Sequence, residues 1–146
     1  MNITVITISG VKNKLITPLV NEYVKRISRF AKVHILDIKE ERKHNHITDI
    51  KKILPSSYII ALDEDGKSYT SELFAKQIEH IQMHLSSHIV FVIGPSAGFS
   101  VEELNTVDAK LSLSPMTFPH ELATMLVCEQ VYRAFTILNN HPYHKE

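Results

Sequence analysis

The last seven residues of the chain carry an unusual concentration of chemically versatile side chains. The tail, residues 140–146, holds His141, Tyr143, His144 and Lys145. Aromatic rings stack on unpaired bases, and cationic groups contact phosphates. The composition of the tail therefore predicts a contact with single-stranded RNA.

Two loops have compositions suited to a small ligand. The segment Gly94 to Gly98 follows an apolar run, but it lacks the G-x-G-x-x-G spacing of a dinucleotide-binding loop. Ligand contact and a simple tight turn both stay open there. The segment 114–119 encloses Met116 and Phe118 between two prolines, and its stiff backbone suits recognition of an adenine edge. The alternative is a connector whose Met and Phe fill the core.

Other kinds of catalytic site find little support in the sequence. His80 and His84 share one face of a predicted helix, but no carboxylate or cysteine completes a metal-ligand set, so we expect solvated histidines and no metal. The single cysteine, Cys128, excludes an internal disulfide. We recognise no Ser/His/Asp triad, P-loop or pair of catalytic acids.

The elements that must position these residues alternate between strand and helix. Strands are predicted over residues 2–8, 33–38, 58–62, 88–93 and 110–114, and helices begin near residues 18, 48, 71, 101 and 119. A turn is predicted at 63–66. This order predicts an α/β fold, a parallel-type sheet with helices on both faces, as a single domain over residues 1–146. Ligands of such sheets bind at the carboxyl ends of the strands.

Composition and charge narrow the class of protein further. The chain has 146 residues, of which 44% are hydrophobic and 22% charged, which fits one globular domain and not a disordered chain. The longest apolar run is too short to span a membrane, and we expect a cytoplasmic protein. Residues 1–56 hold eleven Lys/Arg against five Asp/Glu, and the rest of the chain has the reverse balance. The excess, which includes Lys39, Arg42 and Lys43, either meets phosphate or is a solvated surface.

The last predicted helix, up to about Leu138, is apolar most of the way round. Such a helix must be covered on several sides, which predicts a homodimer. Glu129 and Arg133 have the spacing of an ion pair within that helix. Its C-terminal end, just before the tail, is expected to lie near the ligand-binding loops.

Five segments carry a resemblance to a known family. They are Ile93-Gly94 with Gly98, Leu113-Ser114, Thr117-Phe118-Pro119-His120, Glu129 to Ala134, and Asn140 to His144. Their residues and spacing resemble the bacterial RlmH family of SPOUT methyltransferases. In the N-terminal half the resemblance is carried mainly by Leu62-Asp63 and Gly10-x-Lys12.

The resemblance implies a homodimer with a C-terminal trefoil knot. It also implies transfer of a methyl group from S-adenosylmethionine to N3 of a pseudouridine in helix 69 of 23S ribosomal RNA. The cofactor contacts that it implies fall on three strand-end loops, at Leu62, Gly94, Pro95, Ser114, Pro115, Met116, Thr117, Phe118 and Pro119.

Removal of the N3 proton needs an acceptor, for which the candidates are His120, Tyr143 and His144. Arg133 or Lys145 is a candidate to hold a phosphate or a developing oxyanion. No spacing singles out the base. His120 either contacts substrate or satisfies a backbone group.

Three residues depart from the usual pattern of the family. Pro95 stands where a second glycine is usual, and it removes an N–H that a cofactor could use. Thr124 replaces a common Arg, and Lys145 replaces a frequent one. Two other functions therefore stay open: an RNA- or ribosome-binding relative with weakened or lost cofactor binding, and a nucleotide-binding domain of flavodoxin-like topology.

Overall fold

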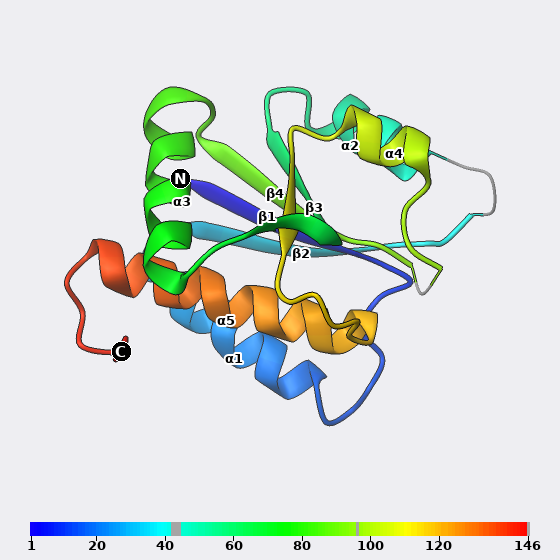
Figure 1. The fold of residues 1–146 in the computed structure, drawn as a ribbon. Coiled ribbons are helices and arrows are strands. Elements are labelled where there is room, and N and C mark those ends of the chain that lie inside the picture. The colour runs from blue at the N-terminus through cyan, green and yellow to red at the C-terminus, as the bar shows by residue number, and fades with distance from the viewer. Residues whose placement is uncertain (42–44, 96, 146) are drawn as a thin grey trace.

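The computed structural model describes residues 1–41, 45–95 and 97–145, and it contains five strands and five helices in strict alternation (Figure 1). In chain order they are β1 (Asn2–Ile8), α1 (Thr17–Ile27), β2 (Lys32–Ile38), α2 (His46–Ile53), β3 (Tyr58–Ser68), α3 (Ser71–His84), β4 (His88–Ile93), α4 (Val101–Thr106), β5 (Ala109–Ser112) and α5 (His120–Leu138). All pairs of neighbouring strands are parallel, in the order β2-β1-β4-β3-β5. The α/β fold class predicted from the sequence is confirmed.

The order of the strands also excludes one of the functions that the sequence left open, the flavodoxin-like domain. A flavodoxin-like sheet has the order 2-1-3-4-5. Here β4 is the strand beside β1, and β3 comes after it. The alternative of a flavodoxin-like domain is therefore wrong.

The two faces of the sheet carry separate hydrophobic cores because successive strand residues point to opposite sides. Ile3 and Val5 belong to the core under α1, α3 and α5, whereas Ile6 and Ile8 belong to the core under α2. Figure 1 shows α1, α3 and α5 on one face of the sheet and α2 with α4 on the other. Helices on both faces were expected from the alternation of elements.

Local capping residues fix most helix starts. The Thr70 side chain accepts a hydrogen bond from the Leu73 amide at 3.2 Å, and Ser100 forms a complete capping box with Glu103. Both caps agree with the sequence. The first helix differs by one residue: Thr17 is its first residue, and Ile16 caps it without a side-chain bond.

The turn predicted at residues 63–66 does not end its strand. Leu62 and Lys67 both pair with Leu111, so the residues between them form a bulge and β3 resumes its pairing with β5 up to Ser68. A Cβ atom on Gly66 would stand 2.8 Å from the backbone carbon of Lys110. Only glycine permits this approach, which the local sequence does not reveal.

Helix α5 packs between α1 and α3 and against β1 and β4. Its own chain therefore covers most of its apolar surface, including Val127, Val131 and Phe135. The strip that its own chain leaves partly exposed is narrower than we expected and contains Leu122, Met125 and Leu126, and the homodimer stays a prediction. The trefoil knot stays a prediction. Within the part of the chain that the structure describes, no helix is long and apolar enough to cross a membrane.

Candidate functional site

A cleft of about 830 Å³ opens at the carboxyl ends of β4 and β5 and at the irregular middle part of β3. Its size falls in the range of small-molecule sites. Eight of the nine residues predicted to contact a cofactor line it: Leu62, Gly94, Pro95, Ser114, Met116, Thr117, Phe118 and Pro119. The ninth, Pro115, is exposed and is not part of the lining. The three loops selected from the sequence therefore form one site.

The glycine loop after β4 supplies one wall of the cleft. Gly98 has φ +79° and its amide bonds the Pro95 carbonyl at 2.8 Å, which closes a tight turn. A Cβ atom on Gly94 would lie 3.0 Å from the ring of Phe99. The glycine thus lets this aromatic ring close against the loop. The loop both makes a tight turn and lines the cleft; its residue Ser96 lies outside the described residues.

The segment 113–119 forms the opposite wall and is held by its own polar groups. The Ser112 hydroxyl donates to the Ser114 carbonyl at 3.0 Å, and the Met116 amide donates to the Ser114 hydroxyl at 3.0 Å. Met116 is 74% exposed, so the idea that it fills the core is wrong, whereas Phe118 does pack against the larger core. These hydrogen bonds hold the loop in a conformation in which Met116 lines the cleft.

Acidic residues that the sequence assigned to a turn line the third side. Asp63, Glu64 and Asp65 belong to the bulge of β3, and the Thr117 hydroxyl donates to Glu64 at 2.5 Å. This hydrogen bond links two walls of the cleft. The sequence pointed to Leu62-Asp63 but not to Glu64 and Asp65, because the bulge depends on pairing with β5, almost fifty positions away.

His120, the only one of the proposed proton acceptors that lines the cleft, has a structural partner. Its Nε2–H donates to the Gly10 carbonyl at 3.0 Å, and the Asn13 amide donates to Glu121 at 2.8 Å. The start of α5 is thereby tied to the loop after β1. The backbone-satisfying role considered for His120 is present.

The tail folds back onto the helices of its own chain. The Tyr143 hydroxyl donates to Glu129 at 3.1 Å and lies 3.2 Å from the Tyr23 hydroxyl, and the Arg133 guanidinium stacks on its ring at 4.8 Å. Burial, the hydrogen bond with Tyr23 and the Glu129 charge raise the pKa of Tyr143. The phenol is therefore neutral at physiological pH.

Arg133 and His144 extend the same network. Arg133 donates to Glu129 through Nε and Nη2 at 3.0 and 2.7 Å, so the ion pair suggested by their spacing is present. These bonds hold the pKa of Arg133 above its usual value. His144 bonds Arg133 at 3.0 Å and Glu72 at 2.8 Å, whereas His141 and Lys145 are exposed.

The tail and the cleft lie at opposite ends of α5 (Figure 1). The helix begins at the cleft with His120 and has 19 residues, which is about 28 Å at 1.5 Å per residue. The expectation that the last helix ends near the cofactor loops is therefore wrong, because it starts there. Within one chain, Arg133, Tyr143 and His144 are not brought to the cleft.

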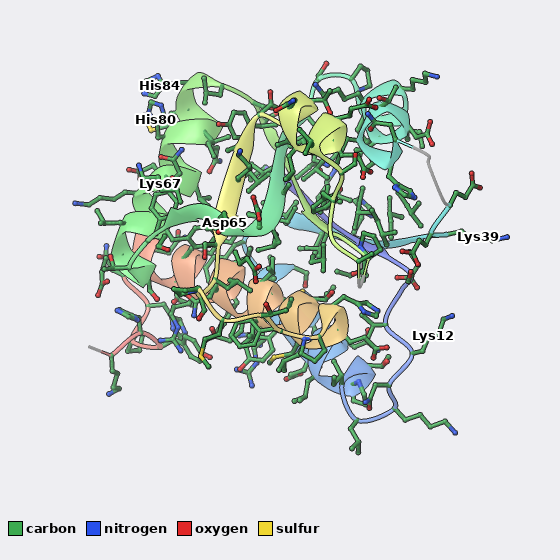
Figure 2. The ribbon with its side chains drawn as sticks, turned by 45° about the vertical axis from the view of Figure 1, so that its right-hand side comes forward. Lys12, Lys39, Asp65, Lys67, His80 and His84 are labelled. Atoms are coloured by element: carbon green, nitrogen blue, oxygen red, sulfur yellow. The ribbon has the colours of Figure 1, made fainter. Side chains whose placement is uncertain are left out.

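The basic side chains of the N-terminal half are only partly described. Lys12 and Lys39 extend outward at the carboxyl edge of the sheet (Figure 2), whereas Arg42 and Lys43 lie outside the described residues. His80 and His84 stand on an outer part of α3, with ring centroids 5.0 Å apart (Figure 2). No group of three or more potential metal ligands occurs among the residues that the structure describes. Burial raises the pKa of Cys128 to about 12, so this thiol is not a nucleophile.

A buried, hydrogen-bonded pair of His46 and Glu103 beside the cleft was not anticipated. His46 Nδ1 lies 2.9 Å from Glu103 Oε2, and both side chains are 5% exposed. Burial acts to raise the pKa of Glu103, but hydrogen bonds from Ser100 and His46 outweigh it and lower the pKa. The pair joins the start of α2 to α4, whose Leu104 lines the cleft.

Comparisons with known proteins agree with this site. Residues 1–144 match the family model described as "Predicted SPOUT methyltransferase". An all-parallel sheet whose ligand cleft lies at strand ends, together with this match, defines the class: the chain belongs to the SPOUT methyltransferase family. Its cofactor is S-adenosylmethionine.

Named relatives match over nearly the whole chain. A "Ribosomal RNA large subunit methyltransferase H" from Clostridium botulinum (strain Langeland) is 42% identical, and one from Exiguobacterium sp. is 38% identical; each match covers 99% of this chain and 100% of the relative. A solved structure of a probable methylase family protein from Haemophilus influenzae superposes with a TM-score of 0.56 at 12% identity. It covers 99% of this chain and 70% of that one, and it supports the fold alone.

Proposed function

We propose that this protein methylates N3 of a pseudouridine in helix 69 of 23S ribosomal RNA, with S-adenosylmethionine bound in the strand-end cleft. The observation that carries the proposal is the assembly of the three loops into one cleft, in a chain that matches the full length of relatives named for methylation of large-subunit ribosomal RNA. A protein with this substrate works in the cytoplasm, where ribosomes are.

The chemistry of the cleft fits the cofactor. Apolar walls that include Phe99, Leu104 and Phe118 suit the adenine ring. The carboxylates of Asp63 and Asp65 suit the positive charges of the sulfonium and amino groups. When bound, the cofactor supplies an activated methyl group, so the protein has mainly to orient it and the base.

The departures at Thr124 and Pro95 have different consequences. Thr124 is fully buried on the inner side of α5, where its hydroxyl lies 2.9 Å from that of Thr7. A change at this position therefore acts on packing of α5 against β1 rather than on RNA contact. Pro95 lines the cleft, so its missing N–H bears directly on cofactor affinity.

We propose a homodimer that combines the tail of one copy with the cleft of the other. The two sites are separated by the length of α5, and a two-fold axis across the exposed strip of α5 would set the helices antiparallel. The tail residues His141, Tyr143, His144 and Lys145 then bind RNA beside the partner's cleft. His120, the candidate proton acceptor that lines the cleft, lies on the cofactor side.

Nucleoside mass spectrometry of 23S ribosomal RNA tests the reaction. We expect the N3-methylated pseudouridine in cells that contain the gene, and its loss in cells without it, with return on complementation. Unchanged modification after deletion would refute the proposed function.

Cofactor binding is tested by calorimetry with a matched pair of methionine variants. Met116 and Met83 are 74% and 68% exposed, but only Met116 lines the cleft. Met116→Ala should weaken S-adenosylmethionine binding several-fold, and Met83→Ala should leave it unchanged. Wild-type protein that binds neither S-adenosylmethionine nor its demethylated product would instead support the RNA-binding relative that has lost its cofactor.

A further inference from the structure

The hydrogen bonds of His144 select one tautomer of its ring. Arg133 is a donor only, and its Nη1 lies 3.0 Å from His144 Nδ1, so Nδ1 must accept. The ring proton therefore sits on Nε2, which donates to the Glu72 carboxylate at 2.8 Å. The ring of His144 lies between the Arg133 guanidinium and the Glu72 carboxylate.

Glu72 is the carboxylate that the fold places against Nε2 of His144. Among the described residues that bond the tail, the other carboxylate is that of Glu129, which already accepts two hydrogen bonds from Arg133 and one from Tyr143. Glu72 stands in the first turn of α3, and the hydrogen bond from His144 lowers its pKa. It is thus ionised at neutral pH and has the charge to orient an imidazole.

The charged and titratable groups around His144 come from three helices and the tail itself. They are Glu72 from α3, Glu129 and Arg133 from α5, Tyr23 and Arg26 from α1 through their contacts with Tyr143 and Tyr132, and His141, Tyr143 and Lys145 of the tail. Among the described contacts, Glu72 is the one acceptor on His144 Nε2. A change of Glu72 therefore acts on the ring proton directly.

We propose that Glu72 is a positioning residue that fixes His144 as the Nε2–H tautomer and so makes Nδ1 the proton acceptor of the tail. The inference rests on the proposed function. Arg133 keeps two bonds to Glu129, so it stays anchored when it gives up its bond to Nδ1 to a substrate oxygen. The N3 proton would pass to Nδ1, and N3 would keep the electron pair with which it bonds the methyl group. The carbon–sulfur bond of the cofactor would break, and its sulfur would keep that electron pair as the demethylated product leaves. The resulting imidazolium lies against the Glu72 carboxylate and later returns its proton to water.

The first test is the tautomer, which needs no RNA. Long-range ¹H–¹⁵N correlation spectra of the full-length protein should show a protonated Nε2 and an unprotonated Nδ1 for His144. Glu72→Ala should produce a mixture of tautomers, and Glu79→Ala, an exposed acid on the same helix, should not. A protonated Nδ1 in the wild type, or an unchanged tautomer in Glu72→Ala, would overturn the inference.

The second test separates kcat from binding. Glu72→Ala should lower kcat for ribosomal particles by at least about tenfold, a part of the roughly 10²–10⁴-fold that a positioned base supplies, and should leave cofactor affinity unchanged. Glu72→Gln keeps an acceptor but not the charge. Its kcat should therefore lie between those of Glu72→Ala and the wild type, with a shifted acidic limb of the pH profile. Equal kcat values for Glu72→Ala and Glu79→Ala would refute the role. An inactive wild type with the expected tautomer would instead refute the proposed function and not the role of Glu72 in fixing His144.

Discussion

The cleft at the start of α5 and the tail beyond its end differ in whether their polar groups are exposed or bonded to other parts of the chain. In the cleft, Met116, Thr117 and the acidic bulge of β3 are partly or fully exposed and face an open volume. At the other end, Tyr143 and His144 are bonded to partners from three helices. One chain therefore presents an open site for a small ligand at one end of α5, while an internal network holds the polar groups of the tail at the other.

The largest expected effect comes from removing the central ring of the tail. Tyr143→Ala loses the stack of Arg133 and the packing against Tyr132, whose ring centroid lies 4.7 Å away. Since one aromatic stack is worth about 1–3 kcal/mol to an unpaired base, methylation of ribosomal particles should fall by about tenfold or more. Calorimetry should show cofactor affinity nearly unchanged.

The control is Tyr143→Phe, which keeps the ring and loses only the hydroxyl contacts with Glu129 and Tyr23. Its activity should lie closer to that of the wild type. If cofactor affinity fell together with activity in Tyr143→Ala, the separation of the two ends would be wrong.

A change on the cleft side should instead reduce stability and cofactor binding together. In Gly66→Ala the new Cβ would meet the backbone of Lys110 and Leu111 at 2.8 and 2.9 Å. Overpacking of this kind costs about 1–3 kcal/mol, and it would displace the bulge that carries Asp63 and Asp65. Thermal unfolding with and without S-adenosylmethionine measures both effects.

Gly98→Ala is the matched comparison, since nothing lies within 4 Å of its added Cβ although its φ is +79°. It should cost only the backbone strain of the left-handed conformation, about 1 kcal/mol. A Gly66→Ala protein as stable as the wild type would contradict the bulge.

The buried pair beside the cleft should appear in the pH dependence of stability. Because the pKa of Glu103 is lower in the folded state, its ionisation stabilises the fold above its unfolded pKa, near 4.5. That contribution is lost as the pH falls through the lowered value. Glu103→Gln should reduce the free energy of unfolding by about 1 kcal/mol at neutral pH and flatten its decline below pH 4.5. Urea unfolding of the wild type and of Glu103→Gln from neutral pH to below pH 4.5 measures this difference. If the pair contributed nothing, the free energy of unfolding would decline in parallel in both proteins.

The smallest effect is expected at Pro95. Pro95→Gly restores an N–H in the cleft wall, and one hydrogen bond is worth about 0.5–1.5 kcal/mol, so S-adenosylmethionine should bind a few-fold more tightly. Pro55→Gly changes an exposed proline outside the cleft and should have no effect on affinity. Weaker binding by Pro95→Gly would mean that the proline serves by stiffening the loop.

Local patterns were enough to predict the elements and three of the loops. Apolar alternation in residues 2–8 marks a strand, and Thr70 and Ser100 cap the helices that follow them, because both signals act within a few residues. Parallel strands point the same way, so the residues after Leu62, Ile93 and Ser112 meet at one edge of the sheet, although those after Leu62 form a bulge within β3 rather than a loop at its end.

Contacts between distant residues decided the rest. The bulge at 63–66 exists because β3 meets β5 twice, and a turn-like composition cannot show that. Tyr23 and Glu72, which bond the tail, are 120 and 72 positions away from their partners, so no spacing near the C-terminus could have predicted them. The sequence by itself determined which elements form and which residue types could bind cofactor and RNA. Only the tertiary structure decided that α5 holds these two sets at opposite ends, because the direction of a helix relative to the sheet depends on packing across the whole chain.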